Sequence, residues 1–439
     1  MDMRSALALL YRRAGFGATS SELSQASALG FTASLTKLLG GLQQADPPAD
    51  AIEVPTMLLP PFYKPKSLNT PAAIAQFNQT LSQERIALTN WWLGRMVAST
   101  NPLKEKLTFF LHCHFPTAIS KVRFPEYMYR QNQIFRTLGG GDFANLTMAV
   151  STDPAMLIWL DAGTDRMPDP NENFARELME RFTMGIGTYT ELDVRAAAFA
   201  FTGWHLNNST GQFAIAPKLH SNTPQTFLGH QGVTTGQEVI NIVTRTSACA
   251  QFVVSSVWSR FAYPVKPSDP LVVELASTYS NDRNMTNLLR TVFEHPNFLS
   301  ASTATGLIKQ PVEYVVGALR ALKIPAARIP AIKPPIMNAL ASLGQVLFDP
   351  PSVGGWPQNE YWLSTSAALA RWRFAHQIAL LSDVSLVADS PPASRVEAVG
   401  ELLSITSWSP STAAALKKAS VNPHTLVTLA LVSPEYVTN

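Results

Sequence analysis

Hydrophobic residues recur at three- and four-residue spacing through most of this chain, and this periodicity limits the folds that it can adopt. Between Ala72 and Met96, apolar side chains stand at Ile74, Phe77, Leu81, Leu88, Trp92 and Met96. Such spacing places them on one face of an amphipathic helix. Further helices are expected at 285–294, 309–322, 335–343 and 364–381. Strand patterns are sparse, so the sequence predicts an all-α protein.

Proline marks where expected helices begin and where long loops run. Asn101-Pro102 and Asp269-Pro270 each place a capping side chain before a proline in the first helical turn. Of the 32 prolines, 14 lie in the segments 47–71, 324–335 and 349–357, where they end helices rather than extend them. We therefore expect a multi-helix globular array with long proline-rich loops.

We expect a single large helical domain over residues 1–439. Within it, the proline-rich residues 41–71 predict a linker or lid, and residues 205–235 predict an irregular loop insertion. The strongest strand pattern of that insertion is FAIAP, from Phe213 to Pro217, so at most a minor β-hairpin is expected. Because 46% of the residues are hydrophobic, a chain of this length can bury a large core without disulfides or metals.

Charge and cysteine content limit the kinds of partner that this protein is expected to bind and the compartment in which it is expected to occur. The 34 basic and 31 acidic residues give a net charge of +3, and no basic run is interleaved with aromatic residues, so we expect no nucleic-acid partner. No apolar run approaches the roughly 20 residues that cross a bilayer, so we expect no membrane partner. Cys113 and Cys249 are expected to be buried thiols in a reducing compartment. The chain as written lacks an export signal, which predicts a soluble, cytoplasmic protein.

The most polar segment is residues 169–190, DPNENFARELMERFTMGIGTYT. Asp169 and Pro170 predict the start of a helix, and Gly185 predicts its end. At about 100° per residue, the helix has an apolar stripe and an opposite polar face. The stripe contains Phe174, Leu178 and Phe182, and the polar face contains Asn173, Arg176, Glu177 and Glu180.

Two interpretations fit this polar face. In the first, Glu177 and Glu180 are catalytic, because neighbouring arginines keep one carboxylate ionised while the other keeps a raised pKa and acts as an acid. Asn173 and Arg176 would orient the glutamates and bind substrate. In the second, ion pairs between residues four apart form a structural clamp. The chain would then be a non-catalytic scaffold that binds a partner protein.

The first interpretation predicts an enzyme that performs hydrolysis or elimination on a polar small molecule such as a saccharide. Two glutamates one turn apart are usually closer than the paired carboxylates of a glycosidase. One of them would then be a supporting residue, with its catalytic partner elsewhere, at Glu313 or Asp193. Sequence patterns of nucleotide-binding loops, zinc proteases and serine hydrolases are missing. We therefore expect carboxylate chemistry without a cofactor.

A pair of histidines lies in the segment FLHCHF. Residues two apart on a helix point in nearly opposite directions, so His112 and His114 could share a metal only if the helix ends there, as the following proline suggests. We expect no metal. His112 is a candidate catalytic residue, because it shares a helix face with Glu105, whose carboxylate could orient its ring. A histidine satisfied within the core is the alternative.

Two predicted loops place a tryptophan beside glycine, in FTGWH and SVGGWPQNEYW. Trp204 and Trp356 could stack on the apolar faces of sugar rings, and His220 could supply a polar contact to the same substrate. The alternative is that both tryptophans fill the core and that the glycines give the backbone clearance.

The segment 161–172 has part of the acidic spacing of an EF-hand calcium loop. The acidic residues are Asp161, Asp165, Asp169 and Glu172. Arg166 stands where the calcium loop needs glycine for its turn. A capped connection between two helices is therefore the favoured interpretation, with calcium as the alternative.

Long segments of the chain resemble a large bacterial family catalogued as a domain of unknown function, number eighteen hundred. They are LLYRRAGFGAT (9–19), EKLTFFLHCHF (105–115), DPAMLIWLD (153–161), PNENFARELMERFTMGIGTYTELDVRAAAFAFTGW (170–204), IKQPVEYVVGALRAL (308–322) and LGQVLFDPPSVGGWP (343–357). The resemblance implies a mostly helical globular protein with no agreed reaction. Many relatives look exported and occur beside sulfatase-like partner proteins. This chain departs from the family pattern at Met1, which no export signal precedes, and at Ser221 and Gln225, where the family tends to have Asp and Lys.

Overall fold

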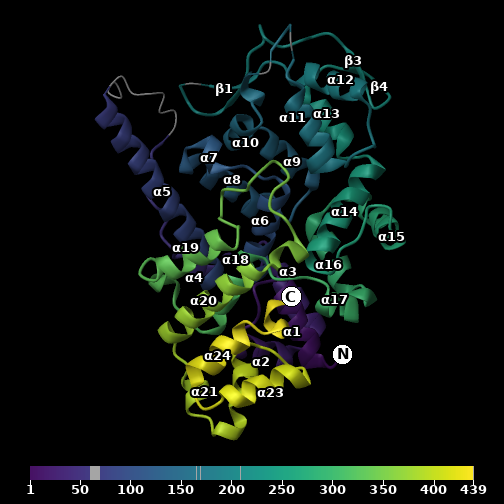
Figure 1. Cartoon of the computed structure of the whole chain (residues 1–439). Helices are drawn as coiled ribbons and strands as arrows, with labels where there is room; N and C mark the ends of the chain where they lie inside the picture. Colours follow the sequence, from purple (N-terminus) through teal and green to yellow (C-terminus); the bar gives the residue numbers. More distant parts are fainter. Residues whose placement is uncertain (60–69, 165, 169, 208, 439) are drawn as a thin grey trace.

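The computed structural model describes residues 1–59, 70–164, 166–168, 170–207 and 209–438. Helices dominate this part of the chain (Figure 1), which confirms the predicted all-α class. The helices of the first half are α1 (Met3–Arg13), α2 (Ser20–Leu29), α3 (Phe31–Gly40), α4 (Pro47–Asp50), α5 (Pro71–Ala98), α6 (Pro102–His114), α7 (Ile119–Val122), α8 (Pro125–Leu138), α9 (Phe143–Ser151), α10 (Pro154–Trp159), α11 (Glu172–Glu177) and α12 (Glu191–Phe201). Those of the second half are α13 (Gly236–Val243), α14 (Ser247–Phe261), α15 (Pro270–Tyr279), α16 (Met285–Glu294), α17 (Ala301–Thr305), α18 (Pro311–Ala321), α19 (Lys333–Ser342), α20 (Thr365–Leu381), α21 (Ser385–Ala388), α22 (Arg395–Leu402), α23 (Pro410–Ala419), α24 (Pro423–Leu431) and α25 (Pro434–Val437).

Helix boundaries follow the sequence closely where a proline or a cap marks them. Helices α6 and α15 begin at Pro102 and Pro270, as predicted. Helix α5 covers the predicted amphipathic segment, and the hydroxyl of Thr70 caps it by accepting a hydrogen bond from the Ala73 N–H. Helix α16 spans the predicted residues 285–294. These ends depend on local chemistry, which the sequence carries in full.

The polar helix differs from its prediction in two ways. It begins at Glu172, with Asn171 as the N-cap, whereas the predicted cap, Asp169, lies outside the described residues. It also continues as a π-helix, η2 (Leu178–Thr183), so an angle of 100° per residue no longer applies there, because π-helical turns are wider. Gly185 ends the helix as predicted, with φ of +79°.

Two antiparallel hairpins form near the predicted insertion, where at most one was expected. β1 (Trp204–Leu206) pairs with β2 (Phe213–Ile215), and β3 (Gln225–Phe227) pairs with β4 (His230–Val233). β2 is the strand predicted from FAIAP. The second hairpin turns through Leu228 and Gly229, both with positive φ. Two-residue hairpin turns favour such angles, but leucine seldom adopts them, so the sequence carried little signal for this turn.

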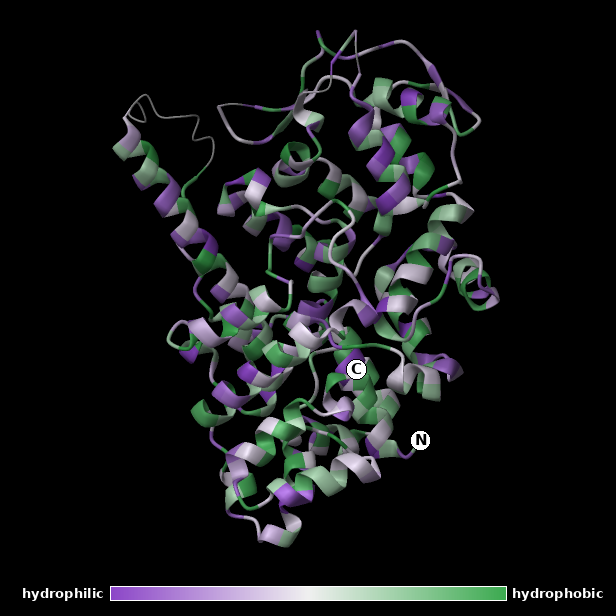
Figure 2. Cartoon of the chain, viewed as in Figure 1, coloured by the Kyte–Doolittle hydropathy of each residue, from purple (hydrophilic) through white to green (hydrophobic). Residues whose placement is uncertain are grey.

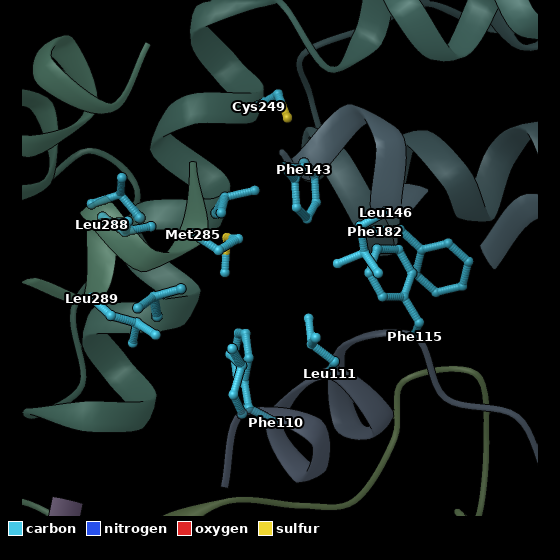
Figure 3. Close-up of a cluster of buried hydrophobic side chains, with 14 of the residues drawn as sticks. Phe110, Leu111, Phe115, Phe143, Leu146, Phe182, Cys249, Met285, Leu288 and Leu289 are labelled. Carbon is cyan, nitrogen blue, oxygen red and sulfur yellow. The ribbon is translucent and has the colours of Figure 1, made fainter. Parts of the chain in front are cut away.

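Two hydrophobic cores meet at α6. The first contains side chains from α1–α3, α9 and α11–α16, and the second contains side chains from α5, α8 and α18–α25. Phe110 and Leu111 of α6 belong to the first core, where Figure 3 shows them near α9 and α16, and Phe109 belongs to the second. Because α6 is packed on both sides, even its charged residues Glu105 and Lys106 are buried.

The two ends of the chain come together in the lower part of Figure 1, where the N-terminal residues contact the connection between α22 and α23. Ser404 Oγ donates a hydrogen bond to the Ala18 carbonyl across this contact, at 2.8 Å. Figure 2 shows hydrophilic and hydrophobic residues mixed along the same helices, as expected of amphipathic helices that bury one face. Within the described residues, no helix is both long enough and apolar enough to cross a membrane.

Residues 41–59 and 70–71 of the proline-rich segment predicted as a linker or lid are described. Residues 60–69 lie outside the described residues. Before them, Asp46 is buried and accepts hydrogen bonds from Ser99 Oγ at 2.6 Å and from the Asn101 N–H at 3.1 Å. These contacts anchor the start of the segment to the turn between α5 and α6. A linker or lid role stays a prediction.

Candidate functional site

A pocket of roughly 520 Å³ lies between the end of α6, the π-helix η2, α14 and the loop around residues 353–358. Its polar or titratable lining residues include Cys113, His114, Glu180, Arg181, Arg260 and Gln310. Another depression, between α19 and α20, has Arg373 as the one charged residue in its described lining. The first pocket therefore contains more side chains that can bind or react with a ligand, and it is the candidate site.

The polar helix places Glu180 at the wall of this pocket. Tyr189 Oη donates a hydrogen bond to Glu180 Oε2 at 3.1 Å, and Arg181 Nη2 lies 3.1 Å from Glu180 Oε1. Glu177 Oε2 lies 3.9 Å from Arg181 Nε. The two glutamates predicted to be catalytic therefore share one arginine, and of the two Glu180 is the one that lines the pocket.

Glu177 sits in a different environment from Glu180. Its Oε2 is buried and has no hydrogen-bond partner among the described residues. Burial raises the pKa of Glu177, Arg181 opposes this rise, and the charge of Glu180 adds to it. Both glutamates stand where α11 changes into a π-helix, a rare structure that frequently occurs at functional sites.

The other two residues of the polar face are engaged away from the pocket. Asn173 Nδ2 donates to the backbone carbonyl at the end of α10, at 3.1 Å. Arg176 pairs with Glu172 at 3.1 Å and with Glu191 at 2.7 Å. Its pairing with Glu180, which helical spacing suggested, is not formed, because Glu191 at the start of α12 accepts two hydrogen bonds from the guanidinium. Substrate-binding roles for Asn173 and Arg176 stay predictions.

His112 is a core residue in this structure. Its Nε2 accepts a hydrogen bond from the Phe348 N–H at 3.2 Å, its ring packs 5.4 Å from that of Trp356, and burial lowers its pKa to about 3. Glu105, which we expected to orient the His112 ring, instead accepts hydrogen bonds from Arg136. His112 and Trp356 are not among the described residues that line the pocket. Their functional roles stay predictions.

His114, which the sequence did not single out for catalysis, does line the pocket. Helix α6 ends there, as predicted, and His114 Nε2 donates to the Phe182 carbonyl at 2.8 Å. Burial lowers the pKa of His114 to about 4, so the ring is neutral at pH 7. Phe115 packs on Phe182 with ring centroids 5.3 Å apart (Figure 3). These contacts fix the end of α6 against the π-helix.

Trp204 and His220 lie in the hairpin region and are not part of the pocket lining. Trp204 is buried, with its ring 5.9 Å from Phe174 and 4.9 Å from Phe201. His220 Nδ1 donates to the Thr202 carbonyl at 2.7 Å. The predicted substrate-binding residues are therefore not gathered around Glu180, and this role stays a prediction for both.

The calcium alternative rests on residues that are only partly described. Asp165 and Asp169 lie outside the described residues. Asp161 pairs with Lys121 at 2.8 Å, and Glu172 pairs with Arg176. Elsewhere in the described chain, no group of three or more His, Cys, Asp or Glu side chains is placed to hold a metal. Calcium at this loop stays a prediction.

Neither carboxylate expected to partner the helix glutamates lines the pocket. Although burial alone would raise it, Arg260 and Lys106 lower the pKa of Glu313 to about 2, and Arg260 Nη2 lies 3.0 Å from Glu313 Oε1. Asp193 caps the start of α12 by accepting a hydrogen bond from the Thr190 N–H at 2.8 Å. Both carboxylates are therefore fully engaged.

Sequence reasoning missed Arg260 and Lys106, although a signal for Lys106 exists. Lys106 follows Leu103 by three residues and precedes Phe110 by four, so it lies on the apolar face of its predicted helix. A charged residue on such a face must be buried or must open a polar site. Searching predicted apolar faces for charged residues would have pointed to this part of the molecule.

Comparison with known families adds one finding. The family model described as "Protein of unknown function (DUF1800)" matches residues 9–438. The chain belongs to this family. The match covers the whole pocket of this DUF1800 protein and confirms the family predicted from sequence. No curated protein and no solved structure matches the chain. The chemistry of the DUF1800 pocket therefore has to be argued from its own residues.

Proposed function

We propose that this DUF1800 protein is an enzyme that uses Glu180, with Glu177 beside it, for acid–base catalysis on a polar small molecule such as a saccharide. The observation that carries the proposal is the contrast between the two carboxylates. Glu180 lines a pocket and is held by Tyr189 and Arg181, whereas Glu177 has a raised pKa. Neighbouring carboxylates in unequal environments are typical of acid–base pairs.

Of the two predicted reaction types, the pocket favours elimination over hydrolysis. Glu180 carries the one carboxylate among the described lining residues, whereas a glycosidase places a second one about 5 to 9.5 Å away, across the scissile bond. In an elimination, a base takes a proton from a substrate carbon, the bond to the leaving group breaks, and an acid protonates the departing oxygen. Glu180 would be the base, Glu177, whose pKa is raised, would supply the proton for the departing oxygen, and no cofactor is required.

A panel of neutral and acidic oligosaccharides tests this function. New reducing ends report cleavage, and ultraviolet absorbance of a new double bond distinguishes elimination from hydrolysis. Glu180→Gln should lower kcat by about 10²- to 10⁴-fold, the usual contribution of a general base, with an unchanged circular dichroism spectrum. Glu294→Gln removes a half-exposed carboxylate of α16 and is the matched control, with wild-type activity expected. The proposal fails if Glu177→Gln and Glu180→Gln both process an identified substrate at the wild-type rate.

A non-catalytic scaffold that binds a partner protein is the alternative proposal, and the ion pairs of Arg176 favour it. Arg176 joins Glu172 of its own helix to Glu191 of α12, and Arg195 lies 3.4 Å from Glu172. The network presents a charged surface, and the family resemblance suggests a sulfatase-like protein as its partner. Loss of the fold in Glu177→Gln would favour this structural role, whereas a folded variant with altered substrate binding would favour the enzyme.

A further inference from the structure

Five basic side chains surround one carboxylate where α1, α6, α14 and the start of α18 meet, and we call them the basic cluster. Its members are Arg12, Arg13, Lys106, Arg260 and Lys309. Among the described residues, Glu313 is the one acidic group that forms an ion pair with any of them. Arg13 and Lys106 are fully buried, and the side chain of Arg260 is 9% exposed.

The basic cluster holds more hydrogen-bond donors than acceptors. Lys106 Nζ and Arg260 Nη2 both contact Glu313 Oε1, and Arg13 Nη2 donates to a backbone carbonyl of α17. Arg12 Nε, Arg13 Nε and Nη1, and Arg260 Nε and Nη2 are buried without a hydrogen-bond partner in the described part of the chain, although Arg260 Nη2 lies within ion-pair distance of Glu313. Buried donors are nearly always paired in folded proteins. Five such nitrogen atoms on neighbouring side chains indicate an acceptor from outside the chain.

The pKa values of the basic cluster reflect the same imbalance. Burial lowers the pKa of Lys106 to about 8; Glu313 opposes this shift, and Arg260 and Arg13 add to it. Burial also lowers the pKa of Arg13 to about 9 and that of Lys309 well below its usual value. An opposite charge placed among these groups would favour their charged forms. A bound anion would therefore offset the repulsion within the cluster.

Arg260 connects the basic cluster to the pocket. Its side chain lines the pocket together with Gln310 and Cys113, and its guanidinium lies 5.0 Å from the ring centroid of Phe109. The same pocket is lined by Glu180, and its volume of roughly 520 Å³ is in the range of small-molecule sites. One bound molecule can therefore place an acidic group at Arg260 and the rest of its structure beside Glu180.

We propose that the end of the pocket at Arg260 binds an oxoanion, and that the substrate of the enzyme proposed above carries such a group, as a carboxylate, a sulfate ester or a phosphate ester. The oxoanion site stands on the basic cluster alone, whereas its assignment to a substrate rests on the proposed function. Guanidinium groups suit this chemistry because their planar N–H donors match the oxygen atoms of these anions.

Binding of inorganic anions tests the site directly. Titration calorimetry and thermal unfolding are run with sulfate, phosphate and acetate, against chloride at equal ionic strength. Sulfate, phosphate or acetate should bind and raise the melting temperature, and the order among them identifies the kind of anion. Arg260→Gln should abolish this effect, and Arg260→Lys, which keeps the charge, should retain part of it. Arg290→Met, in the exposed pair with Glu294, is the control and should leave anion binding unchanged.

The Lys309→Met variant tests whether the basic cluster is an anion-binding site or only a structural cluster. Lys309 Nζ lies over the ring of Tyr436, so methionine keeps the packing and removes one charge. We expect the variant to melt at a higher temperature than the wild type without sulfate, because the repulsion falls. It should bind the preferred anion about tenfold more weakly, which corresponds to about 1.4 kcal/mol. A lower melting temperature with unchanged anion binding would overturn the proposal, as would a wild type that responds to none of the three anions.

The glutamate variant distinguishes this inference from the proposed function. Glu180→Gln should lose turnover and keep its affinity for the preferred anion. If that variant keeps full turnover while the wild type binds the anion, the catalytic role of Glu180 is wrong and the oxoanion site stands. If turnover is lost and the wild type binds no anion, the catalytic role stands and the oxoanion site is wrong.

Discussion

Glu105 and Lys106 are neighbours on α6, yet they belong to two buried charge clusters with opposite properties. Glu105 accepts hydrogen bonds from Arg95 and Arg136, and Arg95 also pairs with Asp50 at 2.8 Å. This cluster therefore pairs two cations with two carboxylates. No nitrogen of either arginine is buried without a partner among the described residues.

Lys106 points into the basic cluster, where Lys106 and Arg260 both contact Glu313 and five arginine nitrogens have no hydrogen-bond partner among the described residues. Both clusters are buried between the same two hydrophobic cores, so packing alone does not explain the difference. Breaking a balanced buried pair is costly, whereas an excess of one charge is itself costly until an opposite charge arrives. The comparison indicates that the Glu105 cluster supports the fold and that the Lys106 cluster binds a ligand.

The largest expected effect comes from breaking the balanced cluster. Arg136→Met removes a guanidinium whose Nε and Nη2 bind Glu105, and it leaves a buried carboxylate with one cation fewer. We expect the free energy of unfolding to fall by about 3–5 kcal/mol, measured by urea denaturation. Arg290→Met, on the surface of α16, should change it by about 0.5 kcal/mol or less. A loss below about 1 kcal/mol for Arg136→Met would remove the structural role assigned to the Glu105 cluster.

The next largest effect is the change in the free energy of unfolding at alkaline pH, which should come from the basic cluster. Lys106 releases its proton near pH 8 in the folded state and near 10.5 when unfolded, so the unfolded state binds more protons between these values. The free energy of unfolding should then rise with pH, by up to about 1.4 kcal/mol per pH unit for each such group. Arg13 adds to the rise above about pH 9.

The rise is best followed by urea denaturation from about pH 7 to about pH 9. At higher pH it is opposed by Cys113 and Cys249, because burial raises the pKa of both thiols to about 12, and by Tyr436, whose pKa is raised well above 10. The Lys309→Met variant should show a smaller rise, and saturating amounts of the preferred anion should flatten the curve of the wild type. A stability that is constant or falls over this range would contradict the charge imbalance assigned to the basic cluster.

The smallest expected effect lies on the polar helix that the sequence made most conspicuous. Arg176 is 33% exposed and its partner Glu191 is 68% exposed, so water screens the pair. Arg176→Ala should change the free energy of unfolding by about 0.5 kcal/mol or less, because exposed ion pairs contribute little. Thermal and urea unfolding of this variant also test the scaffold alternative. A loss of several kcal/mol would show that the network is a structural clamp.

Much of the fold could be predicted from sequence because helix ends depend on nearby residues. Pro102 and Pro270 marked two starts, and Gly185 marked an end. The apolar stripe of the polar helix was also correct, since Phe174 and Phe182 are both buried. The π-helical turn and the second hairpin were missed, because neither follows from the pattern of hydrophobic residues alone.

The candidate site was predictable only in part. The local pattern pointed to Glu177 and Glu180 together, because a polar face within an apolar protein is visible in the sequence, and the structure places Glu180 at the pocket wall. The local pattern was not sufficient to choose between His112 and His114. That choice depends on which of the two hydrophobic cores packs against each side of α6. The predicted roles of Trp204 and His220 also assumed that loops distant in sequence would gather at one pocket.

Local sequence thus settled where the helices lie and which of their faces are apolar, because caps, prolines and hydrophobic spacing act over a few residues. Tertiary packing settled which charges meet. Lys106 and Glu313 are 207 residues apart in the chain, and they form a buried pair because folding brings α6 and the first turn of α18 to the same place. Electrostatic energies depend on distance in space and on exclusion of water, so the charge imbalance at Arg260 emerges only after the chain has folded.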